Sequence, residues 1–230
     1  MSLPFFVCDD PRAGVLVGPE AQHAHVKRIA VGEQIMLTDG FGLTTTVTVT
    51  HTAKNELRGD VVAQHVVEAP SPRVTVVQAI PKSERSELAV DLAVQAGADA
   101  IIPWISHRTI ARWPENKQAK MVEKWQNQAL ASAKQARRAW VPQVAAPVSS
   151  GWLGGVDKQK LILHEDATTS IRDVELSDDI YLVVGPEGGI GADELELIGG
   201  TPVKLGPEVL RTASAAFAGL CAIGTLTKRW

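Results

Sequence analysis

Two glycine-containing segments are the residues best placed to bind a ligand. One is Gly185–Gly189, which reads GPEGG, and the other is Leu205–Arg211, which reads LGPEVLR. Each follows a short apolar run and precedes a helical pattern, so each is expected at the carboxyl end of a buried strand, where α/β sheets bind ligands. Glycine there lets the backbone come close to a bound molecule. The alternative is that both are tight turns that use glycine only for its backbone freedom.

The chemistry of these loops is not that of a phosphate or metal site. The glycines at 185, 188, 189 and 191 do not form G-x-G-x-x-G, and the chain has no G-x-x-x-x-G-K-[ST]. Glu187 stands where a phosphate would favour a cation. The run 164–166, His-Glu-Asp, lacks the spacing of a zinc site, so no metal is expected. The loops therefore predict an uncharged pocket lined by backbone.

The elements that must position these loops alternate between short apolar runs and helical stretches. The expected strands are Val74–Ile80, Ala100–Pro103, Leu161–Leu163, Ile180–Val184 and Val203–Leu205. The expected helices are Ser83–Gly97, Pro114–Arg138, Ala192–Ile198 and Thr212–Lys228. Apolar runs without polar interruption are typical of parallel strands buried on both faces. The predicted fold class of this part is therefore α/β.

The first seventy residues show a different pattern. β-branched and alternating residues predict strands at Pro4–Cys8, Glu33–Asp39 and Leu43–Thr50, with one helix near Glu20–Ala30. Two prolines in the six residues 68–73 disfavour both a helix and a central strand. We therefore expect two domains, 1–70 and 74–230.

Composition limits the class of protein. The 230 residues are 45% hydrophobic and 21% charged, as in folded globular chains. The longest apolar run, Ala215–Gly224, is far shorter than the roughly 20 residues that cross a bilayer, and no basic residue precedes the apolar start of the chain as in a signal peptide. We expect a cytoplasmic protein without a membrane partner. Cys8 and Cys221 have no neighbours that indicate a disulfide or a zinc site.

Charge is distributed unevenly although the net charge is only −3. Residues 107–140 contain eight Lys or Arg against two Glu, whereas residues 155–199 contain eleven Asp or Glu against three Lys or Arg. The basic stretch could bind nucleic acid. It could equally match the acidic stretch within one chain or between subunits.

Several motifs together resemble the RsmE family. They are GPEGG at 185–189, LGPEVLRT at 205–212, KQARRAWVP at 134–142, Lys82 with Arg85, HVKR at 25–28, Gly32-Glu33 and Asp39-Gly40. The family consists of SPOUT-superfamily methyltransferases that transfer a methyl group from S-adenosylmethionine to N3 of one uridine in 16S ribosomal RNA. The resemblance covers the full chain.

The resemblance implies a C-terminal SPOUT-type parallel-sheet domain with a trefoil knot and a small N-terminal PUA-like β-barrel. It also implies a homodimer that acts on 16S rRNA or the small ribosomal subunit. The family's cofactor-binding positions correspond to Val184, Gly185, Gly188, Leu205, Gly206 and Leu210. The expected catalytic residues are Arg138 and Arg211, which would stabilise negative charge on the base. The expected RNA contacts are Lys27, Arg28, Lys82 and Arg85.

Two other functions remain open. Gln95, Lys134 and Ala213 stand where family members commonly carry a carboxylate. This departure favours a non-catalytic RNA-binding or ribosome-assembly protein that uses the SPOUT domain for dimerisation. A metabolic enzyme that binds a small nucleotide at the strand ends is the third alternative.

Overall fold

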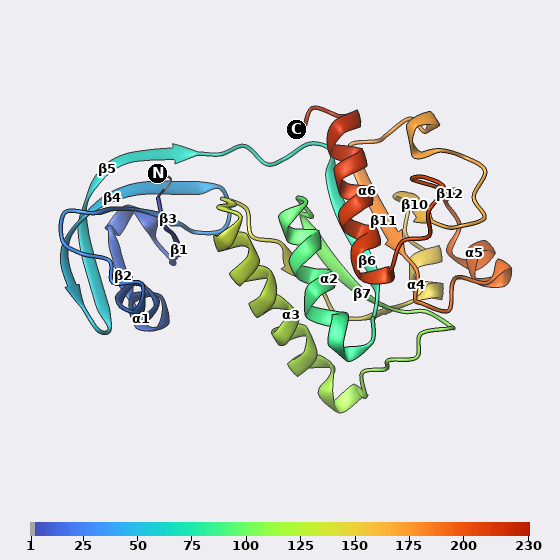
Figure 1. Cartoon of the computed structure of the whole chain (residues 1–230), viewed down its shortest axis with the longest axis horizontal. Helices are drawn as coiled ribbons and strands as arrows, with labels where there is room; N and C mark the ends of the chain where they lie inside the picture. Colours follow the sequence, from blue (N-terminus) through green and yellow to red (C-terminus); the bar gives the residue numbers. More distant parts are fainter. Residues whose placement is uncertain (1–2) are drawn as a thin grey trace. The chain divides into compact units, whose positions relative to one another are not determined.

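The computed structural model describes residues 3–230, and the side chains of all of these except residues 83 and 84. The chain forms two compact units (Figure 1). The first contains the residues up to Ala69 together with Ala133–Val141, and the second contains Pro70–Ser132 and Pro142–Trp230. Neither unit is one continuous stretch of sequence.

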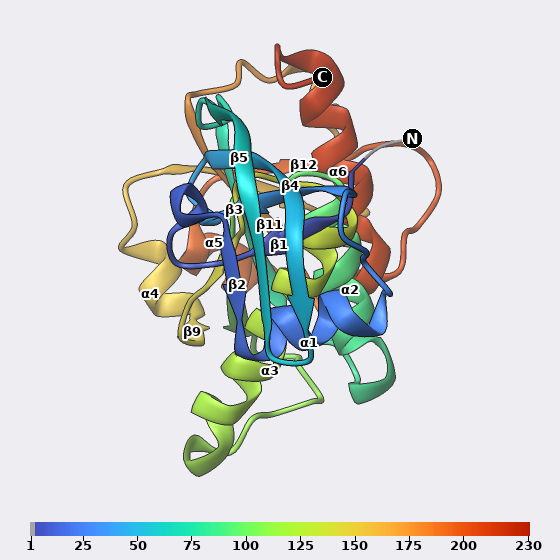
Figure 2. The ribbon, with the colours of Figure 1, turned by 90° about the vertical axis from the view of Figure 1, so that its left-hand side faces the viewer.

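The first unit is a curled five-stranded sheet with one helix. Its elements are β1 (Phe5–Val7), η1 (Pro11–Ala13), β2 (Val15–Val17), α1 (Gly18–Val26), β3 (Gln34–Thr38), β4 (Leu43–Ala53) and β5 (Glu56–Val66). The strand order is β1-β3-β4-β5-β2, and only the β1–β3 pair is parallel. The long β4–β5 hairpin, whose strands lie side by side in Figure 2, is irregular at Thr46/Val47 and Val49/His51. Such bulges bend strands, and Figure 1 shows the bend of β5. Phe6, Leu16, Ile35, Leu37 and Leu57 lie in the core that this curl encloses.

Three details of this unit differ from expectation, and one is strand β2, which was not predicted because it is only three residues long. The predicted helix Glu20–Ala30 is α1, which ends at Val26, and Arg28 then adopts a left-handed φ of 58° that no α-helix can continue. Strand β5 was not predicted. Of its eleven residues only Leu57 is buried, so it lacks the apolar run by which the other strands were recognised.

A segment from far along the sequence completes the first unit. Trp140 forms a β-bridge with Phe41, and the amides of Gly42 and Val141 donate to the carbonyls of Ala139 (3.0 Å) and Gly40 (2.9 Å). The approach is close because residue 42 is glycine, where a Cβ would lie 2.8 Å from the Trp140 ring and the φ is 102°.

The second unit is built on a seven-stranded sheet in which every strand pair is parallel. Its strands are β6 (Arg73–Ala79), β7 (Ala100–Ile105), β8 (Gln143–Val144), β9 (Val148–Ser149), β10 (Gln159–Leu163), β11 (Asp179–Val184) and β12 (Thr201–Val203). The order is β12-β10-β11-β6-β7-β8, and β9 also pairs with β7. Its helices are α2 (Ser83–Gln95), α3 (Glu115–Gln135), α4 (Ser150–Gly154), α5 (Ala192–Ile198) and α6 (Thr212–Leu226), with η2 at Ile171–Asp173. The predicted α/β class with a parallel sheet is confirmed.

Helices cover both faces of this sheet, which explains the unbroken apolar runs. Along β11, Val183 faces a cluster with Leu153 of α4 and Ile198 of α5. Leu182, the residue before it, faces α6 on the other side of the sheet. A Cβ built on Gly219 of α6 would lie only 2.9 Å from the Leu182 side chain. Helix α2 packs beside α6 (Figure 1). Strands buried on both faces cannot show a polar alternation.

The helix and strand boundaries need small corrections. Helix α3 was predicted to reach Arg138 but ends at Gln135, since Arg137 has a left-handed φ of 56°. The last strand was predicted at Val203–Leu205 and lies at Thr201–Val203. Strands β8 and β9 and helix α4 were not predicted, because they are too short for a periodic signal.

Candidate active site

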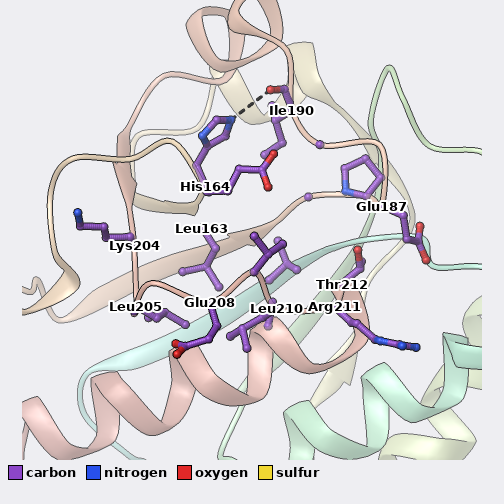
Figure 3. Close-up of a pocket in the computed structure, with 18 of the residues that line it drawn as sticks. Leu163, His164, Glu187, Ile190, Lys204, Leu205, Glu208, Leu210, Arg211 and Thr212 are labelled. Carbon is purple, nitrogen blue, oxygen red and sulfur yellow. Dashed lines mark hydrogen bonds between the residues drawn. The ribbon is translucent and has the colours of Figure 1, made fainter.

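A pocket of about 370 Å³ opens at the carboxyl ends of three neighbouring strands, β10, β11 and β12. The volume lies within the range of small-molecule sites. Both glycine-containing loops form its walls, as the sequence predicted (Figure 3). Its apolar lining includes Leu163, Val184, Ile190, Val203, Leu205, Val209, Leu210 and Ala215.

The first loop is held in shape by close packing and two hydrogen bonds. A Cβ on Gly185 would lie 2.8 Å from Ile190, and the amide of Gly189, at a φ of 70°, donates to the carbonyl of Pro186 at 3.0 Å. The Nδ1 atom of His164 accepts from the amide of Asp166 (3.2 Å), so Nε2 carries the proton and faces the Ile190 carbonyl at 3.3 Å (Figure 3). His164, directly after β10, therefore holds the first loop at Ile190, its C-terminal end.

The second loop joins β12 to α6. Before the loop, the backbone of Lys204 bonds to Thr169 (2.9 Å) and to Ile171 (3.1 Å). Helix α6 begins at the buried Thr212, which also lines the pocket. The loop is therefore anchored at both ends, while its residues 206–211 are exposed.

The expected uncharged lining is wrong. Three carboxylates, Glu165, Glu187 and Glu208, and three basic side chains, Arg85, Lys204 and Arg211, line the pocket together with the apolar residues. Glu187 and Arg211 lie on one side of it, and Lys204 lies on the other (Figure 3). Such a lining suits a ligand that combines an apolar ring system with both positive and negative groups.

Seven of the predicted site residues come together in this pocket. They are Arg85, Val184, Gly185, Leu205, Gly206, Leu210 and Arg211. Gly188 and Lys82 do not line it. A Cβ on Gly188 would point at Arg108, 3.3 Å from its Cβ, and the Nη1 group of Arg108 donates to the Gly188 carbonyl at 3.2 Å. Lys82 is exposed at the start of α2.

The other three predicted residues, Lys27, Arg28 and Arg138, belong to the first unit. Lys27 and Arg28 are exposed after α1, whereas Arg138 is half-buried and its amide donates to the Ala133 carbonyl at 2.9 Å. Nearby, Lys134 forms an ion pair of 2.5 Å with Glu20. A lysine at this position therefore has a carboxylate partner within the same unit.

Several polar lining residues were not selected from the sequence, among them His164, Glu165, Glu187, Lys204 and Glu208. Each lies within five residues of a strand's carboxyl end, and this position is the signal that could have identified them. Among the side chains that the structure describes, no three His, Cys, Asp or Glu residues are grouped to hold a metal ion. In residues 3–230 no helix is long and apolar enough to span a membrane.

The sequence is similar to that of known RNA methyltransferases. Residues 68–224 match the family model of the RNA methyltransferase domain. The chain is 41% identical to ribosomal RNA small subunit methyltransferase E of Mycobacterium bovis, over 100% of this chain and 94% of that protein. It is 25% identical to the protein of the same name from Bacillus subtilis, over 93% and 90% of the two chains.

Solved structures agree over the whole chain. Ribosomal RNA small subunit methyltransferase E from Neisseria gonorrhoeae, solved bound to S-adenosyl methionine, has a TM-score of 0.88 at 27% identity and covers 98% of both chains. A Legionella pneumophila protein in complex with the same cofactor has a TM-score of 0.87 at 28% identity, again over 98% of both chains. The chain belongs to the ribosomal RNA small subunit methyltransferase E family and is an RNA methyltransferase.

Proposed function

We propose that this chain transfers a methyl group from S-adenosylmethionine to N3 of a uridine in small-subunit ribosomal RNA, and that the pocket between the two loops binds the cofactor. The observation that carries the proposal is the mixed lining of this pocket in a chain of this family. Relatives solved with the cofactor bound share the fold over nearly their full length. The choice of N3 rests on the family resemblance of the motifs.

The pocket residues fit the chemical groups of the cofactor. Leu163, Val203 and Leu205 offer apolar surface to the adenine ring, and the carboxylates of Glu187 and Glu208 complement positive charge on an amino group or sulfonium. The third basic lining residue, Lys204, complements a carboxylate. When bound, S-adenosylmethionine supplies an electrophilic methyl group.

The protein's own contribution to the chemistry is to place and stabilise the base. N3 of uracil carries an imide proton that must pass to solvent before nitrogen can attack the methyl carbon, so negative charge develops on the base. The new N–C bond forms as the S–C bond breaks, and S-adenosylhomocysteine leaves. Arg211, at the edge of the pocket, can stabilise this charge by electrostatics and hydrogen bonding. Positioning of the two reactants supplies the remaining rate enhancement.

Arg138 acts in this proposal as a second cation toward the base or a phosphate, contributed by the other subunit of a homodimer. A mixture of two impaired chains tests it, assayed at a cofactor concentration well below the Kd of the Gly206→Val variant. Arg138→Ala removes the cation, and Gly206→Val fills the cofactor pocket, so a heterodimer of the two has one intact site. Partial recovery of activity on mixing supports action across the dimer, and no recovery in a proven heterodimer contradicts it.

The first unit is the proposed RNA-binding part, with Lys27 and Arg28 as contacts to phosphate. Both are exposed and follow one another at the end of α1. Lys82 and Arg85, at the start of α2 in the second unit, are the other proposed RNA contacts. A ribosomal substrate also favours a cytoplasmic location.

One experiment tests the activity. The protein is incubated with methyl-labelled S-adenosylmethionine and small ribosomal subunits, and the rRNA is digested to nucleosides. Label in 3-methyluridine is expected. Label in another nucleoside would contradict the N3 assignment alone, and RNA binding without any label would favour the non-catalytic assembly protein.

A further inference from the structure

Beside the pocket, but not among its lining residues, lies a fully buried carboxylate. Glu194, in the first turn of α5, is 0% exposed. Burying a charged group is costly unless hydrogen bonds replace its water. The groups that donate hydrogen bonds to this carboxylate therefore identify the segments that Glu194 joins.

Three donors surround the carboxylate, and all of them are neutral. The Ser106 hydroxyl donates to Oε2 at 3.0 Å, and the His107 amide and the Ser150 hydroxyl donate to Oε1 at 2.8 and 2.6 Å. The Trp104 indole N–H in turn donates to the Ser150 hydroxyl at 3.1 Å. Glu194 thereby connects the start of α5 with the segment after β7 and with the start of α4.

The segment after β7 also reaches the first glycine loop. Arg108 follows directly on the two residues that Glu194 holds, and it donates to the Gly188 carbonyl at 3.2 Å. Arg108 is also closely packed against this loop, because Cβ atoms built on Gly188 and Gly191 would lie 3.3 Å from its Cβ and 3.1 Å from its Nη2. The loop thus runs between Arg108 and α5, which both depend on the same carboxylate.

We propose that Glu194 is a positioning residue for cofactor binding. It fixes residues 106–108 against α5, and Arg108 then holds Gly188 in a loop whose residues Gly185, Glu187 and Gly189 line the pocket. The proposal rests on the proposed location of the cofactor in this pocket. Glu194 touches no reactant, so its removal should raise the Kd and KM for S-adenosylmethionine while kcat at saturating cofactor changes little.

The first test compares substitutions at Glu194 and at a second carboxylate of low exposure in the same unit. Glu194→Ala is expected to raise the Kd for S-adenosylmethionine, measured by calorimetry on folded protein, by about tenfold or more, which is about 1.4 kcal/mol. Glu194→Gln should restore most of the affinity, since an amide oxygen accepts from the His107 N–H and the serine hydroxyls can rotate. The control is Asp99→Asn, which alters this second carboxylate at the opposite ends of the strands. It should lower the melting temperature and leave Kd unchanged.

The second test asks whether Glu194 acts through Arg108. Arg108 is exposed, so Arg108→Ala should fold normally. It should also weaken binding, and the double variant should bind no worse than Glu194→Ala alone, because the two residues act in series. Additive effects on Kd would overturn this route.

The outcomes separate this inference from the pocket assignment. Weakened binding in Gly206→Val together with an unchanged Kd in Glu194→Ala, or in Arg108→Ala where Glu194→Ala does not fold, would overturn the role of Glu194 alone. Unchanged binding in Gly206→Val would overturn the pocket assignment itself.

Discussion

The two ends of the parallel strands in the second unit use charge in opposite ways. At the amino ends, Arg229 and Asp99 form an ion pair of 2.6 Å with side chains only 6% and 10% exposed. Arg229 also donates to the carbonyls of Gly97 and Pro72, and Asp99 accepts from the Val74 amide at 2.7 Å. These charges satisfy each other and the backbone around them.

At the carboxyl ends, six charged side chains line the pocket instead. In the described part of the chain, no ion pair joins them to one another. The buried carboxylate at this end, Glu194, receives only neutral donors from surrounding loops. The charges at the amino ends, called the closed end below, are therefore paired, whereas those at the carboxyl ends, called the open end, line the pocket proposed to bind the cofactor. Substitutions at the two ends should therefore have separable effects.

The largest effect is expected at the closed end. Arg229→Met leaves Asp99 buried without its cation, and breaking such a pair costs about 3–5 kcal/mol of the free energy of unfolding. Denaturant unfolding measures this loss. Calorimetry on folded protein should show an unchanged Kd for S-adenosylmethionine. A higher Kd would contradict the separation of the two ends.

At the open end, Arg211→Ala should lower kcat by about 10²–10³, comparable to the loss of one oxyanion donor. The free energy of unfolding should hardly change, because Arg211 is exposed. Arg211→Lys should recover activity only in part, since lysine lacks the planar fork. Arg172→Ala, at an exposed arginine outside the pocket, is the matched control. Equal activity of the Arg211→Ala and Arg172→Ala variants would show that Arg211 does not contribute to catalysis.

A smaller effect is expected for Gly206→Val. The structure has room for the side chain, because the nearest atom to a Cβ there is the mobile end of Glu208 at 3.4 Å. The valine should occupy cofactor space and raise the Kd for S-adenosylmethionine by about tenfold, or 1.4 kcal/mol. Gly151→Val in α4, whose Cβ has no neighbour nearer than 4.0 Å, is the control and should bind normally.

The smallest effect is expected for an exposed ion pair at the closed end. Lys158 lies 2.8 Å from Asp179, and the hydrogen bond and charge of that carboxylate raise the pKa of the lysine. Its contribution is therefore complete below the ordinary lysine pKa of about 10.4 and is lost as the pH rises through the higher pKa of the folded state. Melting curves of Lys158→Gln and the original chain should differ slightly at neutral pH and converge at high pH and in high salt. A difference that persists in both conditions would contradict an ion-pair origin.

Sequence patterns predicted those parts of the fold that depend on local regularity. The apolar runs Val74–Ile80 and Ile180–Val184 correspond to β6 and β11, and their lack of alternation follows from helices on both faces. Strand β5 could not be recognised because its side chains are mostly exposed. The β-bridge between Phe41 and Trp140 depends on a contact across a hundred positions, which no local pattern encodes. The trefoil knot of the C-terminal domain and the PUA-like β-barrel of the N-terminal domain stay predictions.

For the site, the sequence predicted the loops better than the lining. Glycine content and position at strand ends located both walls of the pocket. The charges of Glu165, Lys204 and Glu208 were missed as a group because they are far apart in the sequence and come together only where three strands end. Gly188 was assigned to the cofactor from a motif, but its Cβ direction toward Arg108 is a property of the folded loop.

The inclusion of Ala133–Val141 in the first unit has a consequence for how such a chain can be rearranged. A single cut, by a protease or by recombination between genes, cannot separate the two units, since the one near the N-terminus would lose the segment that pairs with Phe41 and Gly42. Its exposed backbone groups would then be free to pair with other chains. Separating the two units with each of them complete would therefore take more than one cut.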